Sequence, residues 1–241
     1  DSGNGGSGVD GAYQINVGLD DYVQSTGWGA GLWGIGTFGG ATALTVNNQL
    51  RLWTLDNFGE DLVSNPRGGG IFYWDKSNDV TTRAVNFTSL SGASDVPTLC
   101  NQIIVSQTDR HIICLGANTI GTTVQDPMLV RWSNQEDAAD WTPTTTNTAG
   151  SLRLSAGSKI LGGLRTRQEI AIFTDNALYS MQFIGPPFTF GINLIAESVS
   201  MVSPQAAVNA NNAIYFMDKD NFYIYEGGIQ VLPCTVRAYV F

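Results

Sequence analysis

Ile170-Ala-Ile-Phe-Thr-Asp-Asn-Ala-Leu-Tyr-Ser-Met-Gln-Phe183 consists of two apolar runs joined by a polar turn. In an extended chain, Ile170 and Ile172 point to one side and Ala171 and Phe173 to the other. A strand that is apolar on both faces must be covered on both faces. The sequence has no long segment with the 3.6-residue period of a helix. We therefore expect neighbouring sheets to supply the cover.

This hairpin pattern occurs four times along the chain. The copies are Leu50–Leu55 with Ile71–Trp74, His111–Leu115 with Met128–Trp132, Ile170–Phe173 with Leu178–Phe183, and Ala213–Met217 with Phe222–Tyr225. The second strands begin at residues 71, 128, 178 and 222, so the steps are 57, 50 and 44 residues. Repeats of about 40–50 residues with several strands each are typical of β-propeller blades. The sequence therefore predicts an all-β fold, a β-propeller with about four four-stranded antiparallel blades.

The composition agrees with many short strands and turns. Of the 241 residues, 43% are hydrophobic and only 14% are charged, well below the usual quarter. There are 28 glycines, and the net charge is −9. The 12 basic residues are scattered without a run, which argues against tight nucleic-acid binding through phosphate neutralisation.

The N-terminal part differs from the repeats. We expect residues 1–40 to form a Gly-rich extended segment and loop, and residues 41–241 to form the blades. The loop carries Trp28, Trp33 and Phe38 in a bed of glycine, and we hypothesise that these aromatic residues contact an adjacent subunit or pack across the blades. Gly34–Gly39 matches G-x-G-x-x-G but lacks the flanking strand and helix of a dinucleotide site. Because the chain opens at Asp1 and closes directly after a strand-like run, we expect a piece of a longer polypeptide.

No catalytic or metal-binding constellation stands out. His111 is the only histidine, and on a strand it faces away from Cys114, three residues later. The three cysteines, Cys100, Cys114 and Cys234, lack the short spacing of structural zinc sites and give no disulfide framework. We expect them to be buried and reduced. The sequence thus predicts no enzyme, no cofactor and no metal.

Carboxylates and aromatic residues leave two alternatives open. Acidic residues cluster at Glu60-Asp61, Glu136-Asp137-Asp140 and Asp218-Asp220, which we interpret as turn and surface residues. A glycosidase would need two carboxyls about 5–10 Å apart in a cleft. Calcium binding at Asp218–Asn221 would lack the EF-hand pattern. In a carbohydrate-binding or carbohydrate-active propeller, Trp74, Trp132 and Tyr225 would stack on sugar rings.

Several longer sequence segments resemble those of a particular protein family. They are Arg51-Leu-Trp-Thr-Leu-Asp-Asn-Phe-Gly-Glu-Asp-Leu62, Asn65-Pro-Arg-Gly-Gly-Gly-Ile-Phe-Tyr-Trp-Asp75, Val130-Arg-Trp-Ser133 with Asp140-Trp-Thr-Pro143, Leu178-Tyr-Ser-Met-Gln-Phe-Ile-Gly-Pro-Pro-Phe188, Asn221-Phe-Tyr-Ile-Tyr-Glu226 and Leu232-Pro-Cys-Thr-Val-Arg237. With these phrases the chain resembles, over roughly residues 10–241, the tail nozzle or packaged-DNA stabilisation protein of short-tailed bacteriophages.

This resemblance implies a virion structural protein. Such proteins are built on β-propellers with more blades than the four hairpins found in this chain. They form a six-fold ring below the portal and adaptor, next to needle or fibre proteins, and genomic DNA passes through their channel. They are not enzymes and do not act in a membrane. An acidic chain would suit a conduit that must not retain DNA. The rival hypotheses are the carbohydrate propeller and a soluble interaction module of a cell.

Overall fold

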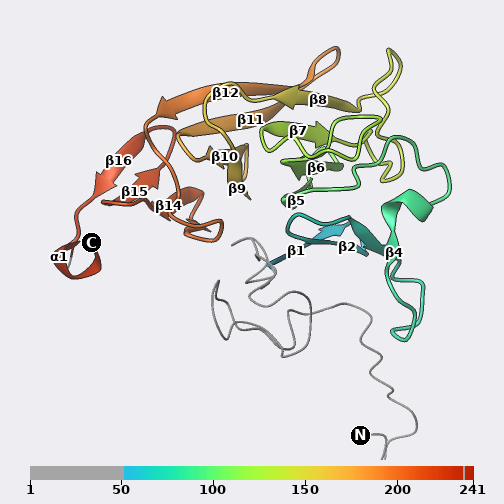
Figure 1. Ribbon diagram of the computed structural model, residues 1–241, viewed down its shortest axis with the longest axis horizontal. Coiled ribbons are helices and arrows are strands. Elements are labelled where there is room, and N and C mark those ends of the chain that lie inside the picture. Colours follow the sequence, from blue (N-terminus) through green and yellow to red (C-terminus); the bar gives the residue numbers. More distant parts are fainter. Residues whose placement is uncertain (1–51, 236) are drawn as a thin grey trace, which may run out of the picture. The chain divides into compact units, whose positions relative to one another are not determined.

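The computed structural model describes residues 52–235 and 237–241. The chain divides into two units, residues 1–52 and 53–241, of which the second holds all the described strands. This unit is all-β and consists of four four-stranded antiparallel sheets (Figure 1). The expected fold class of antiparallel four-stranded blades is confirmed. The expected loop with Trp28, Trp33 and Phe38 lies outside the described residues.

Each sheet is a meander of four strands that follow one another in the chain, and we number the sheets as blades 1 to 4. Blade 1 contains β1 (Trp53–Phe58), β2 (Asp61–Pro66), β3 (Phe72–Trp74) and β4 (Val85–Asn86). Blade 2 contains β5 (Gln102–Ser106), β6 (His111–Leu115), β7 (Leu129–Trp132) and β8 (Gly150–Arg153). Blade 3 contains β9 (Ile160–Arg165), β10 (Ile170–Thr174), β11 (Ala177–Gly185) and β12 (Thr189–Glu197). Blade 4 contains β13 (Ala207–Ala210), β14 (Ala213–Met217), β15 (Phe222–Tyr225) and β16 (Ile229–Leu232).

Three of the four predicted hairpins are confirmed. The strands β6 and β7, β10 and β11, and β14 and β15 pair antiparallel as expected. The first hairpin was wrong, because Asp61–Pro66 forms a strand, β2, between β1 and β3. The residues between the two strands of that expected hairpin include Asp, Asn, Glu, Pro and Gly, which are typical of turns. In the fold Leu62 and Val63 pair with Trp74 and Tyr73 instead.

Helix is almost absent from the described residues. Residues 52–235 contain one 3-10 turn, η2 (Phe87–Ser89), and residues 237–241 contain a four-residue helix, α1 (Arg237–Val240). The blades therefore cover one another, and the first strands of successive blades are in contact: β1 with β5, β5 with β9, and β9 with β13. These first strands are the innermost strands of a propeller-like stack whose sheets follow one another along an arc in Figure 1.

An apolar core fills each of the three spaces between blades. Between blades 2 and 3, Ile113 and Leu115 pack with Ile170 and Ile172. On the other side of β10, Ala171 and Phe173 pack with Ile214 and Phe216 of blade 4. The two-faced alternation predicted for residues 170–173 is thus confirmed. A third cluster joins Phe58 and Val63 of blade 1 to Val105, Ile112 and Cys114 of blade 2.

Hydrogen bonds join the innermost strands as well. The Gln102 side chain accepts from the Gly163 N–H and donates to the Gly163 carbonyl, both at 2.8 Å. The Asp56 carboxylate accepts from the Val105 N–H at 2.8 Å and pairs with Arg165 at 3.1 Å. These side chains satisfy backbone groups that a first strand exposes at its free edge. They hold neighbouring blades at a fixed spacing.

Candidate functional site

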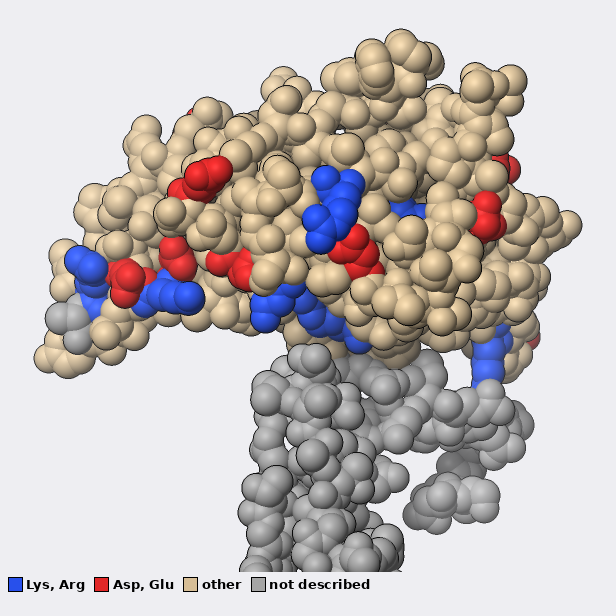
Figure 2. Space-filling view, turned by 45° about the horizontal axis from the view of Figure 1, so that its top comes forward, with Lys and Arg blue, Asp and Glu red and all other residues tan. Residues whose placement is uncertain are grey.

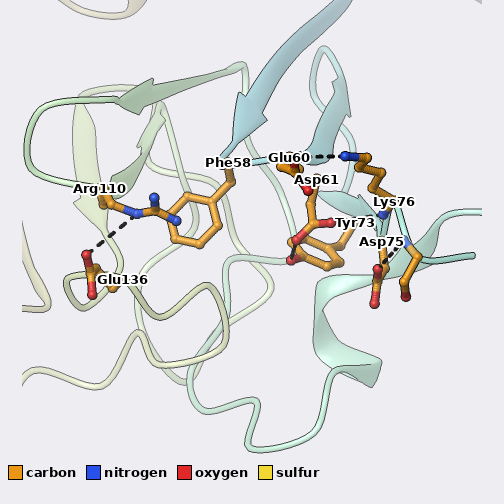
Figure 3. Close-up of a pocket in the computed structure, with 10 residues that line it drawn as sticks. Phe58, Glu60, Asp61, Tyr73, Asp75, Lys76, Arg110 and Glu136 are labelled. Carbon is orange, nitrogen blue, oxygen red and sulfur yellow. Dashed lines mark hydrogen bonds and ion pairs between the residues drawn. The ribbon is translucent and has the colours of Figure 1, made fainter.

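A solvent-open pocket of about 530 Å³ lies at one end of blades 1 and 2 (Figure 3). It is lined by Phe58, Gly59, Glu60, Asp61, Tyr73, Asp75, Lys76, Ser77, Arg110 and Glu136. These residues come from the β1–β2 turn, from β3 and the turn after it, and from two loops of blade 2. Gly59 has φ +71°, and a Cβ there would lie 3.1 Å from an Arg110 nitrogen, so the turn requires glycine.

The pocket has an aromatic side and two cation–carboxylate pairs. The Arg110 guanidinium lies 5.4 Å from the Phe58 ring centroid and pairs with Glu136 at 3.7 Å. Lys76 pairs with Glu60 at 2.8 Å. Both pairs are exposed, so each contributes little to stability. Figure 3 shows the two pairs on opposite sides of the pocket, with Asp61 and Tyr73 nearer the Lys76 pair.

The remaining carboxylates are engaged within the pocket. Asp61 accepts a short hydrogen bond from the Tyr73 hydroxyl and another from the Lys76 N–H at 2.9 Å. Burial and the bond to Asp61 raise the pKa of Tyr73. Hydrogen bonds from Ser77 lower the pKa of Asp75. Each carboxylate of the pocket thus has a hydrogen-bond donor or a cation as a partner. The pocket is equipped for contact with polar groups.

His111 is buried at the start of β6. Its Nε2 lies 3.0 Å from the Thr148 hydroxyl, Nδ1 has no partner, and the ring packs on Phe183 and Phe190 of blade 3. Burial lowers the pKa of His111. Cys114 packs on the opposite side with blade 1, as its three-residue offset predicted. His111 therefore belongs to the packing between blades 2 and 3.

The cysteines are free, and two of them are buried. Burial and the neighbouring Cys100 thiol raise the pKa of Cys114. Cys234 is only half-buried, so the expectation of burial holds for Cys100 and Cys114 alone. The sequence did not predict that Cys100 and Cys114 meet, because Cys100 lies outside the strand pattern. In the described part of the chain, no three His, Cys, Asp or Glu side chains are grouped to hold a metal.

The acidic clusters lie in turns and loops, as predicted, except that Asp61 is the first residue of the strand β2. Asp137 accepts from the Ala139 N–H at 2.8 Å, and Asp140 accepts from the Ser94 hydroxyl at 2.9 Å. Asp218 accepts from the Lys219 N–H at 2.7 Å. These contacts shape the backbone of the loops.

Two of the three aromatic residues named for sugar stacking are buried. Trp132 packs against Phe190, and Tyr225 donates to Glu169 at 2.7 Å. Trp74 is half-buried, and its indole N–H donates to the Thr82 carbonyl at 2.9 Å. Of the three residues, Trp74 is the most exposed to solvent.

The structure brings together Glu60, Asp61 and Glu136, which the sequence had marked separately. Sequence reasoning did not find Tyr73 or Arg110 as pocket residues. Arg110 reaches Phe58 across 52 positions of the chain, and only the stacking of blade 2 on blade 1 brings the two together. No pattern in the neighbouring sequence predicts such a contact.

Charges of both signs lie side by side on the face in Figure 2, which is otherwise occupied by uncharged residues. No continuous basic stripe of the kind that follows a phosphate backbone is visible on this face. No helix among residues 52–235 and 237–241 has the length and apolar character needed to cross a membrane.

Comparisons with known proteins identify no family for this chain. No family model matches the chain, and no curated protein matches its sequence. Among solved structures it is similar to PorZ, a bacterial surface component of the type-IX secretion system of Porphyromonas gingivalis. The identity is 11% and the TM-score 0.47, and the match covers 77% of this chain and 27% of that chain. This chain thus spans about a quarter of the length of that relative.

Proposed function

We propose that the chain is a virion structural protein of a bacteriophage tail. It would form part of a homo-oligomeric, six-copy nozzle ring that continues the DNA channel below the portal. The proposal rests on the sequence segments that resemble tail-nozzle proteins. The observation in the structure that supports it best is the rigid coupling of the blades.

This coupling has two layers. Apolar cores fill the spaces between the sheets, and side chains such as Gln102 and Asp56 bond the backbone of the next innermost strand. A packed stack of this kind resists deformation, because protein interiors are as dense as molecular crystals. Resistance to deformation is what a ring around a pressurised channel requires.

The charge pattern also supports a conduit role. Basic residues are few, and four of them pair with carboxylates: Lys76, Arg110, Arg153 and Arg165. Such pairing leaves little positive charge to neutralise phosphates. DNA would then pass the protein without being retained.

A carbohydrate-binding propeller is the second candidate. The partial exposure of Trp74 favours it, whereas the burial of Trp132 and Tyr225 weighs against it. A glycan array separates the two candidates. We expect no glycan to bind above background, and binding that Trp74→Ala abolishes would replace our proposal with the sugar-binding function.

Native mass spectrometry of the whole chain tests the tail function directly. We expect assemblies of six copies, with no retention on double-stranded DNA at physiological salt. Tight, salt-sensitive DNA binding by an assembly of any size would contradict a conduit role.

A further inference from the structure

The end of the β11–β12 hairpin contacts blade 2, although its strands belong to blade 3 (Figure 1). Phe183 and Phe190 pair directly across the two strands. Their ring centroids lie 5.6 and 5.1 Å from that of His111 in β6. Phe190 also meets Trp132 of β7 edge to face at 5.3 Å. We call residues 183–190 the clasp, because an aromatic cluster around His111 joins this segment to blade 2.

The hydrogen bonds around Thr148 determine where the neutral His111 ring carries its proton. The Thr148 hydroxyl donates to Asn134 Oδ1 at 2.9 Å, and this oxygen also accepts from the Gln135 N–H at 2.9 Å. Because its one proton is used there, the Thr148 oxygen accepts from His111 Nε2–H at 3.0 Å. Nδ1 is then a bare nitrogen that has no hydrogen-bond partner among residues 52–235 and 237–241.

A second proton on His111 would be poorly accommodated in this cluster. The residue is fully buried, and the proton would create both a positive charge and a new N–H donor at Nδ1. A buried charge or donor without a partner loses its hydration and gains little in return. Burial accordingly lowers the pKa of His111, although the carboxylate and backbone of Asp109 act to raise it.

Asp109 is the charged residue whose field acts on the His111 ring. Its carboxylate accepts from the Ser106 hydroxyl at 2.9 Å. In the same turn Arg110 pairs with Glu136, and the clasp contains no charged residue. The other charged side chains of the adjoining strands and loop have partners elsewhere: Arg131 bonds the Asp95 and Asn118 carbonyls, Asp137 the Ala139 N–H, Asp140 the Ser94 and Asn147 side chains, and Glu169 the side chains of Ser180, Gln182 and Tyr225.

Of the elements around His111, the clasp is the one that can move away with the smallest loss of contacts. The strand β6 is buried at every position and is paired on both sides, by β5 and β7. The clasp ends a hairpin whose strand β12 is the outermost of blade 3, and its Ile184 and Phe188 are 57% and 73% exposed. Such exposed segments open locally at a lower free energy than core strands do.

We propose that protonation of His111 releases the clasp from blade 2. Opening gives the charged ring access to water and uncovers Phe183, Phe190 and Trp132. In the open state the ring has its ordinary pKa of about 6.5, so the clasp is closed above this pH. Below it, each pH unit favours the open state by up to about tenfold, until the lower pKa of the closed state is reached. The inference does not depend on the proposed tail function.

Hydrogen–deuterium exchange of the whole chain tests the release. Amides of the clasp report its opening, whereas those of the buried strand β10 report global unfolding. After correction for the intrinsic effect of pH on exchange, clasp protection should fall by up to about tenfold per pH unit below about pH 6.5. We expect β10 to remain far better protected than the clasp at every pH.

Proton NMR of the wild-type chain provides a second readout. His111 is the only histidine, so its ring signal needs no assignment. The protonated fraction of the ring and the open fraction of the clasp should follow the same pH curve. This comparison needs no substitution, and it therefore decides the question even where a variant fails to fold.

Two variants identify the titrating group. His111→Phe keeps a ring in the cluster but cannot be protonated, so clasp protection should become independent of pH over this range. Asp109→Asn is the matched control, because it removes the ionisable neighbour and keeps the histidine. The pH dependence of clasp protection should persist in this control. Circular dichroism of each variant checks that the fold is retained.

Three outcomes would overturn the proposal. A ring that titrates while the clasp stays protected would mean that the proton enters the closed cluster. Equal protection of the clasp and β10 would mean that the ring is charged only on global unfolding. A wild-type pH dependence in His111→Phe would assign the release to another group.

Discussion

Phe173 of β10 and Phe216 of β14 meet edge to face between blades 3 and 4, with their ring centroids 5.0 Å apart. Both rings are buried, and they come from second strands of adjacent sheets. Edge-to-face contact is favoured between aromatic rings beyond the gain from buried area. The pair therefore reports directly on how tightly the two blades are stacked.

Truncating either ring should destabilise the fold. We expect Phe173→Ala or Phe216→Ala to lower the free energy of unfolding by about 3–5 kcal/mol, through lost burial and the cavity left behind. Phe188→Ala, at a ring that is 73% exposed, is the control and should cost well under 1 kcal/mol. Urea denaturation measures all three. A cost below about 1 kcal/mol at both buried positions would show that the blades are not packed as described.

The Gln102 side chain tests the hydrogen bonds between innermost strands. Gln102→Ala removes two bonds to Gly163 and leaves backbone groups of an edge strand without partners. We expect a loss of about 1–3 kcal/mol in the free energy of unfolding. Gln135→Ala, on an exposed side chain, should be neutral. Equal effects of the two substitutions would remove these bonds from the account.

Glu169 should make stability depend on acid pH. Burial acts to raise the pKa of Glu169, but hydrogen bonds from Ser180, Tyr225 and Gln182 outweigh it, and the pKa is lowered. A lowered carboxyl pKa contributes stability that is present above about pH 4.3, the unfolded value, and is lost as pH falls through the folded value. Glu169→Gln should reduce this loss in urea titrations at several pH values. A pH profile of Glu169→Gln identical to that of the wild type would contradict this role of Glu169.

His111 should make stability depend on pH in a higher range than Glu169 does. Burial lowers the pKa of His111, so the folded state holds the neutral ring while the unfolded chain binds a proton. Its contribution to stability is present above about pH 6.5 and is lost as pH falls toward the folded value. In His111→Leu the stability should change less between pH 6.5 and 5. An unchanged slope would mean that the ring is accessible to solvent protons in the folded state.

The sequence predicted the blades because their signal is local. Alternating apolar residues in Ile170–Phe173 and Ala213–Met217 already require cover on both faces. The sequence did not predict the strand β2, because Asp61, Asn65 and Pro66 resemble turn residues. The pairing of β2 with β3 overrides that local preference. The sequence did not predict the pocket either, for a different reason. Arg110 and Phe58 meet only after blade 2 stacks on blade 1, and no spacing along the chain encodes that contact.

Class averages of the purified chain by electron microscopy test the central claim most directly, that these blades are parts of a closed, symmetric assembly. The account predicts a six-fold arrangement of copies around a channel. Single four-bladed arcs without symmetry, at concentrations where the chain is folded, would contradict it.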